Sequence, residues 1–187
     1  HVVYHPRVSA SLLGHLSAAI SGSAIARGTS FLRDQMGQQV MSKAITIHDD
    51  PLRPRGLRSA GFDGEGVKTE KLTTVDKGVL QCWWLDSAAA RQLESETNGR
   101  AARGIGGPPS PSATNLYMQA GEESVETMLK NIGTGFYVTE LIGMGVNGVT
   151  GDYSRGASGF WIENGEIAFP VSEMTIAGNL KEMFLHM

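Results

Sequence analysis

Hydrophobic positions near the start of the chain recur at helical spacing. Leu12, Leu16 and Ile20 lie four residues apart, and the positions between them are mostly Ala, Ser and Gly. Because residues at this spacing share one face of a helix, the pattern predicts a helix over 9–27 that ends before Gly28. Small side chains on its other faces would let neighbouring backbone approach closely, so we expect this helix to be heavily buried.

The pattern then changes to β-branched and aromatic residues in alternation, which favours strands. It predicts strands within 39–47, 69–85, 136–142 and 146–150. Two tight hairpins are expected as well. One turns at Asp76-Lys77-Gly78, and the other turns at Asn164-Gly165 between two alternating apolar runs, a strong short hairpin signal.

Three shorter helices are predicted from their start and stop residues. The first begins at Asp86 or Ser87 and ends near Asn98-Gly99. The second covers 123–132, and the third begins at Asn179. Residues 100–114 hold three prolines and almost nothing apolar, which predicts a loop without regular structure. Strands outnumber helices and the hairpins are antiparallel. The expected fold is therefore α+β, a mainly antiparallel sheet with hairpins and a few packed helices.

Composition narrows the class of protein. A chain of 187 residues fits one domain, and its net charge of -3 argues against direct nucleic-acid binding. No apolar run reaches the length of a membrane span, and Cys82, the single cysteine, excludes an internal disulfide. With no secretory signal at the start, we expect a cytoplasmic protein.

Motifs for cofactor and metal chemistry are incomplete. Residues 143–148, Gly-Met-Gly-Val-Asn-Gly, have the letters of a dinucleotide-binding loop, but a strand pattern follows where a helix is required. Close backbone packing is the better interpretation of these glycines. His48-Asp49-Asp50 offers metal-ligand types, although neighbours on a strand point to opposite faces. His15 lies in the apolar run of the first helix and is interpreted as a core histidine with satisfied hydrogen bonds. We expect no metal site.

Two segments could recognise a ligand or could be ordinary loops. Arg53, Arg55 and Arg58 form a basic cluster, and Arg100 begins the Pro/Gly-rich segment; either could bind phosphate or carboxylate, or lie in solvent. Residues 150–159 are dense in small and hydrogen-bonding side chains. They predict either a tight connection, with Asp152 accepting from local amides, or a loop that lines a cleft.

An ordered series of blocks resembles the C-terminal signature of the TldD/PmbA family, also called modulator of DNA gyrase. The blocks span nearly the whole chain and include Met144–Asn147, Val149–Ala157, Trp161–Ile167 and Thr175–Asn179, with Gly28-Thr29-Ser30 and Asp49-Asp50-Pro51 upstream. Family proteins are longer at both ends. The resemblance implies that residues 1–187 are a C-terminal domain, without the N-terminal domain and the extreme C-terminus.

The resemblance also implies a role. In this family TldD and PmbA (TldE) chains pair into a cytoplasmic zinc metalloprotease that degrades peptides and matures some peptide products, and the TldD-type chain carries His-Glu-x-x-x-His on a helix. Counted back from Gly28, these positions hold Leu13, Gly14 and Ala18, which can neither ligate zinc nor act as a base. The chain is therefore similar to the PmbA/TldE-type subunit.

The resulting hypothesis is a non-catalytic subunit that has no catalytic residue and no cofactor of its own, with zinc in a TldD-type partner. We expect a homo- or heterodimer that contacts a peptide substrate through the 147–158 segment and the 100–114 segment. Two alternatives remain open: a binding module that modulates DNA gyrase, and a homodimeric peptidase with an unrecognised site. The candidate peptide-binding residues are Asn147, Thr150, Asp152, Tyr153, Ser154 and Arg155.

Overall fold

The computed structural model describes all residues from 1 to 187. None of its helices combines the length and the apolar character that crossing a membrane would require. The elements in chain order are β1 (Val2–Tyr4), α1 (Pro6–Ala19), α2 (Gly22–Ala26), β2 (Ile47–Asp49), β3 (Leu72–Asp76), β4 (Val79–Leu80), α3 (Ser87–Gln92), β5 (Ala101–Ala102), β6 (Ser110–Pro111), β7 (Leu116–Met118), α4 (Val125–Ile132), β8 (Gly135–Val146), β9 (Asp152–Glu163), β10 (Glu166–Asn179) and α5 (Leu180–Leu185).

The strands form two four-stranded sheets and one short ribbon. The large sheet has the order β1-β8-β9-β10, in which β1 is parallel to β8 and the other pairs are antiparallel. The small sheet has the order β4-β3-β2-β7 and is antiparallel throughout. Strands β5 and β6 pair only with each other. The predicted α+β class with mainly antiparallel sheets is confirmed.

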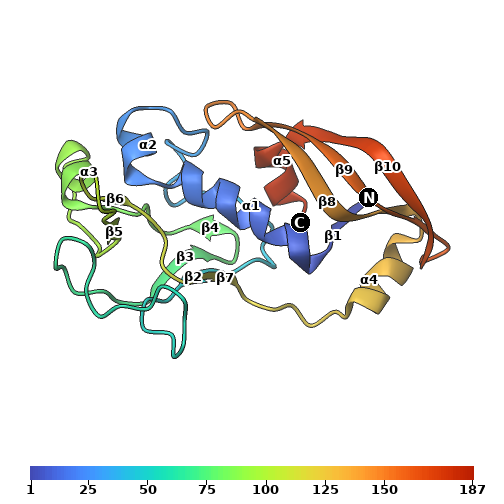
Figure 1. The fold of residues 1–187 in the computed structure, drawn as a ribbon, viewed down its shortest axis with the longest axis horizontal. Coiled ribbons are helices and arrows are strands. Elements are labelled where there is room, and N and C mark those ends of the chain that lie inside the picture. Colours follow the sequence, from blue (N-terminus) through green and yellow to red (C-terminus); the bar gives the residue numbers. More distant parts are fainter.

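Helix α1 crosses the middle of the molecule between the two sheets (Figure 1). Its apolar face carries Leu12, Leu16 and Ile20 into one core that also includes Ile47 of the small sheet and Val138 of the large sheet. Leu16, Ile20, Ile47 and Val138 have no exposed surface at all. The helical spacing therefore identified the correct buried face.

The predicted single helix over 9–27 is wrong, because the chain leaves helical geometry at Ile20 and Ser21 and forms α1 and α2 instead. The cause is Trp84. Its N–H donates to the Ile20 carbonyl at 3.0 Å, and its carbonyl accepts from the Gly22 N–H at 2.8 Å. A Cβ at Gly22 would lie 2.7 Å from the Trp84 oxygen, so only glycine allows this approach.

The expectation that the first helix is heavily buried is also wrong. The small residues Ala10, Gly14 and Ala18 are exposed, and no atom lies within 4 Å of a Cβ built on Gly14. The small-residue face of α1 is therefore open to solvent, while the opposite face supplies the core contacts.

Both predicted hairpins are confirmed. Lys77 and Gly78 have φ of 46° and 80° between β3 and β4, and Asn164 and Gly165 have φ of 53° and 79° between β9 and β10. Two consecutive residues with positive φ form the tight turn whose twist matches the flanking strands. Gly165 also lies against α4, where an added Cβ would be 2.8 Å from the Cα of Lys130.

The predicted strand pair over 136–150 is one strand, β8, that continues through Gly143 and Gly145. Gly143 has φ +83°, and the ladder to β9 shifts register between Ile142 and Gly145. A Cβ at Gly145 would lie 2.2 Å from the Ser154 carbonyl oxygen. Close backbone packing is thus the role of Gly145, whereas a Cβ on Gly143 would meet no atom within 4 Å, and its positive φ is what favours glycine there. The segment interpreted as a connection or a cleft loop over 150–159 mostly belongs to β9.

The shorter helices begin where their capping residues predict. Asp86, Ser124 and Asn179 each accept a backbone N–H with the side chain at the start of α3, α4 and α5. Helix α3 ends at Gln92, earlier than the expected Asn98. The 100–114 segment is not without structure, since β5 and β6 pair within it.

Strand β10 forms the edge of the large sheet opposite β1 and is exposed along most of its length. Its exposed side chains include Ile167 and Phe169. Its pairing with β9 shifts register before Pro170 and again after Val171, close to Glu173 with φ 58°. Helix α4 covers only the far end of the sheet, where Leu129 packs on Val3 and Ile162.

Candidate functional site

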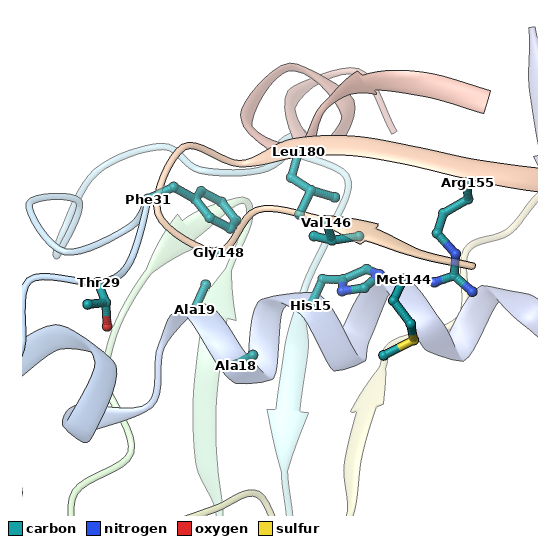
Figure 2. A pocket seen from close by; sticks show the side chains of 10 residues that line it. All are labelled: His15, Ala18, Ala19, Thr29, Phe31, Met144, Val146, Gly148, Arg155 and Leu180. Atoms are coloured by element: carbon teal, nitrogen blue, oxygen red, sulfur yellow. The ribbon is translucent and has the colours of Figure 1, made fainter. Parts of the chain in front are cut away.

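A pocket of about 330 Å³ opens where α1 meets the ends of β8 and β9. Its position follows from the fold, since the β8–β9 turn at Gly148 lies over α1 near Ala19 (Figure 2). The lining residues belong to α1, to the segment that follows α2, to β8 and the β8–β9 turn, to β9, and to the start of α5. The lining residues are His15, Ala18, Ala19, Thr29, Phe31, Met144, Val146, Gly148, Arg155 and Leu180.

Arg155 supplies the only formal charge in this lining. Figure 2 shows its side chain descending from β9 toward α1, beside Met144 and His15. Its Nε donates to the Ile142 carbonyl at 3.2 Å, which fixes the base of the guanidinium group. Arg155 forms no salt bridge with any carboxylate of residues 1–187. The pocket therefore carries a positive charge that no acidic side chain offsets.

His15 is the second polar group in the pocket. Its ring meets Tyr153 edge-on, with 5.8 Å between the ring centres. Burial, and then the charge of Arg155, lower the pKa of His15 below its ordinary value, so the ring is neutral near pH 7. Its Nε2 is buried without a hydrogen-bond partner. The interpretation of His15 as a core histidine with satisfied bonds is thus wrong: the residue is half-buried and lines a pocket.

Two tyrosines are associated with the charged groups of this site. The hydroxyl groups of Tyr4 and Tyr153 are buried, and neither has a partner of regular hydrogen-bond geometry. Burial, and then the neighbouring Tyr153, raise the pKa of Tyr4 above its usual range. The Tyr4 phenol is consequently a neutral neighbour of Arg155 and does not supply the negative charge that the pocket lacks.

The β8–β9 turn is held by its own side chains. The Asn147 side chain accepts from the Val149 N–H at 2.9 Å. Thr150 donates to Asp152 at 2.6 Å, and Asn179 of β10 donates to the same carboxylate at 3.1 Å. These bonds from Thr150, then Asn179, lower the pKa of the Asp152 carboxyl group. Side-chain hydrogen bonds therefore tie the turn to the end of β10.

The six candidate peptide-binding residues do not line one common pocket. Arg155 lines the first pocket. Asn147, Asp152, Tyr153 and Ser154 line a shallower neighbouring hollow of about 580 Å³, shared with the Met144–Gly148 backbone, and Thr150 lines neither. The Tyr153 side chain itself belongs to the core, with 2% of its surface exposed. Residues 100–114 contribute to a separate pocket with no lining residue in common with these two.

Several pocket residues were missed by sequence reasoning. Ala18, Thr29, Phe31 and Leu180 come from three separate segments, and none of them is chemically unusual. The one usable signal was the Gly28-Thr29-Ser30 turn directly after the predicted helix. It places Thr29 and Phe31 opposite the end of α1.

The other candidate ligands are engaged in the structure. Asp49 and Arg100 form a fully buried ion pair, and the Asp50 side chain accepts from the Leu52 N–H at 2.9 Å. The Nδ1 of His48 lies 3.2 Å from the Thr73 hydroxyl, and its ring is tilted by 50° against that of Tyr117, with 5.5 Å between the ring centres. His48, Asp49 and Asp50 thus serve three different contacts, as the alternation of a strand predicts.

The positions that would carry a zinc motif lie on α1 beside the pocket. Ala18 lines the pocket, Gly14 is exposed, and Leu13 packs against the core. None of the three has a donor atom, so these residues do not fit zinc. Residues 1–187 contain no group of three or more His, Cys, Asp or Glu side chains arranged to hold a metal ion.

Comparison with known proteins identifies the family. The family described as PmbA/TldA metallopeptidase C-terminal domain matches residues 1–187. The chain is 46% identical to the metalloprotease PmbA of Escherichia coli O157:H7 over 184 residues, which are 98% of this chain and 39% of that protein. It is 40% identical to a PmbA homologue of Haemophilus influenzae over 186 residues, 100% of this chain and 40% of that protein.

Solved structures agree with this assignment. The chain is similar to TldE from Thermococcus kodakarensis, with a TM-score of 0.88 and 28% identity over 98% of this chain and 42% of that one. A Thermotoga maritima protein, named provisionally as a modulator of a DNA gyrase, gives a TM-score of 0.89 and 33% identity over the same shares. The chain thus spans about two fifths of the length of these relatives. It belongs to the PmbA/TldD family, whose C-terminal domain it matches over its whole length.

Proposed function

We propose that this chain is part of a PmbA/TldE-type subunit, which pairs with a TldD-type subunit to form a cytoplasmic zinc metalloprotease acting in peptide degradation and maturation. In this arrangement the TldD-type subunit holds the zinc and performs the hydrolysis. The subunit described here completes the chamber and helps to hold an extended peptide. It contributes no catalytic residue.

One observation carries this proposal. Helix α1 presents Leu13, Gly14 and Ala18 at the positions of the His-Glu-x-x-x-His motif, and a zinc site needs His, Cys or carboxylate donors there. Two further observations support it. The relatives include proteins named PmbA and a protein named TldE, and a TldD homologue of Buchnera aphidicola is 27% identical over 89% of this chain.

The test is reconstitution with the natural protein that carries this chain. We expect it to copurify with the TldD-type protein of the same organism, and the pair to contain one zinc ion by elemental analysis. Peptide cleavage is expected to require both proteins, and to disappear when the zinc-binding histidines of the TldD-type subunit are replaced.

A matched variant checks that α1 takes no part in hydrolysis. Gly14→Ala leaves the helix intact, so cleavage by the pair should be unchanged. Stoichiometric zinc in this protein alone, or peptide cleavage by it alone, would overturn the accessory role. Unchanged cleavage after its removal from the mixture would do the same.

A further inference from the structure

The pocket beside α1 has a composition that calls for a particular ligand chemistry. Arg155 is half-buried in the pocket wall and has no carboxylate partner among residues 1–187. Its Nε is already committed to the Ile142 carbonyl. The two terminal nitrogens of the guanidinium group remain, and their fork geometry matches the two oxygens of a carboxylate.

His15 offers a second donor on the same side. Its ring is neutral, and Nε2 is buried without a partner. An N–H buried without an acceptor is costly, so the tautomer that places the proton on Nδ1 is favoured. Nδ1–H is then the ring donor available to a ligand. Figure 2 shows the imidazole and the guanidinium group entering the pocket from α1 and β9 respectively.

The remaining wall is apolar apart from Thr29, whose hydroxyl donates to the Ala24 carbonyl at 3.3 Å. Ala18, Ala19, Phe31, Val146 and Leu180 surround the space next to the two polar groups, and Met144, which is 91% exposed, forms its outer edge. A volume of about 330 Å³ lies at the small end of the range for ligand pockets, roughly 300 to 1,000 Å³. This volume is enough to hold one residue of a peptide.

We propose that this pocket binds the free C-terminus of a peptide whose last side chain is apolar. The carboxylate pairs with the terminal nitrogens of Arg155 and accepts from Nδ1–H of His15. The side chain occupies the apolar wall formed by α1 and the start of α5. This inference extends the proposed function, because the peptide would be a substrate or product of the metalloprotease.

The test compares two peptides that differ only in the terminal group. N-acetyl-Ala-Ala-Leu is titrated into the natural protein as the free acid and as the C-terminal amide, by calorimetry and without the TldD-type subunit. We expect the free acid to bind at least about tenfold more tightly than the amide. Because no cleavage is measured, a negative result would leave the accessory-subunit proposal standing.

Variants assign the contacts. Arg155→Gln should remove the preference for the acid, while Arg155→Lys should retain part of it because the charge remains without the fork. Ala18→Leu should fill the pocket and weaken both peptides, and Arg91→Gln on the exposed end of α3 is the matched control with no effect. Equal binding of acid and amide, or an undiminished preference in Arg155→Gln, would overturn the proposal. So would an Arg155→Gln variant that loses its TldD-type partner, since the carboxylate would then belong to that subunit.

Discussion

The Nε of Arg100 lies 2.5 Å from Oδ2 of Asp49, and both side chains are completely buried. The other carboxylate oxygen accepts from the backbone N–H and the hydroxyl of Thr114, at 2.8 and 3.0 Å. The terminal nitrogens of Arg100 donate to four backbone carbonyls, among them Glu70 at 2.7 Å. This pair therefore connects the small sheet to the β5–β6 ribbon with every strong donor and acceptor satisfied.

Removing one member of this pair should destabilise the protein strongly. Asp49→Asn leaves the Arg100 charge buried without a counter-charge, and we expect a loss of about 3–5 kcal/mol in the free energy of unfolding. Urea denaturation of the natural protein measures it. Asp34→Asn is the matched control, because the Arg33–Asp34 pair is exposed and should contribute about 0–1 kcal/mol. Equal effects of the two substitutions would contradict the prediction.

Two glycine substitutions should act in opposite directions. Gly145→Ala places a Cβ 2.2 Å from the Ser154 carbonyl oxygen, so β8 and β9 must move apart at a cost of about 1–3 kcal/mol. Gly14→Ala meets no atom within 4 Å and should stabilise α1 by about 0.5–1 kcal/mol. Thermal unfolding of both variants checks the prediction. It is wrong if Gly145→Ala unfolds at or above the wild-type temperature.

Stability should decrease in mild acid because of His15. Its pKa in the folded protein lies below the ordinary 6.5, mainly through burial and then through Arg155. As the pH falls below 6.5, the His15 imidazole becomes protonated in the unfolded chain but stays neutral in the folded protein. The free energy of unfolding therefore decreases until the pKa of the folded state is reached. The difference in stability between the wild type and His15→Gln, measured from pH 7.5 to 5, isolates this effect.

Arg155 provides an internal check on that assignment. In Arg155→Gln the imidazole pKa, followed by NMR, should rise because a neighbouring positive charge is gone. It should remain below 6.5, because burial is the larger cause. An unchanged His15 titration in this variant would show that the two side chains do not interact.

Cys82 should be nearly inert toward thiol reagents. Burial raises the pKa of its thiol to about 11, with Arg100 lowering it and Asp49 raising it. At pH 8 the thiolate fraction is then about a hundredfold smaller than for an ordinary cysteine. Reaction with a chromogenic disulfide at pH 8 should be slower by at least that factor than for glutathione, and should accelerate after unfolding in urea. Rapid labelling of the folded protein would refute the assignment.

Local signals in the sequence predicted the elements whose causes are local. The turns at Lys77-Gly78 and Asn164-Gly165 depend on two consecutive residues, and the starts of α3, α4 and α5 depend on one capping side chain each. The buried face of α1 followed from spacing alone. Family resemblance, carried by blocks of residues in a fixed order, was confirmed by the match over residues 1–187.

Non-local contacts explain the failures. The break between α1 and α2 depends on Trp84, more than sixty residues later, and β8 continues through Gly143 and Gly145 only because β9 pairs with it. The exposure of Gly14 could not be read from its neighbours in sequence. The pocket likewise joins Phe31, Arg155 and Leu180, which are distant along the chain, so composition indicated a possible binding region but not its wall.

The irregular backbone of β10 affects how readily copies of this protein associate through their sheet edges at high concentration. A long free edge with exposed Ile167 and Phe169 would ordinarily recruit a strand from another molecule and seed aggregation. Pro170 lacks an N–H, and the register shifts on either side of the Pro170–Val171 pair bend the strand near Glu173. Strand β10 therefore completes its own sheet, but its irregular backbone prevents a strand of a second copy from pairing with it along its whole length.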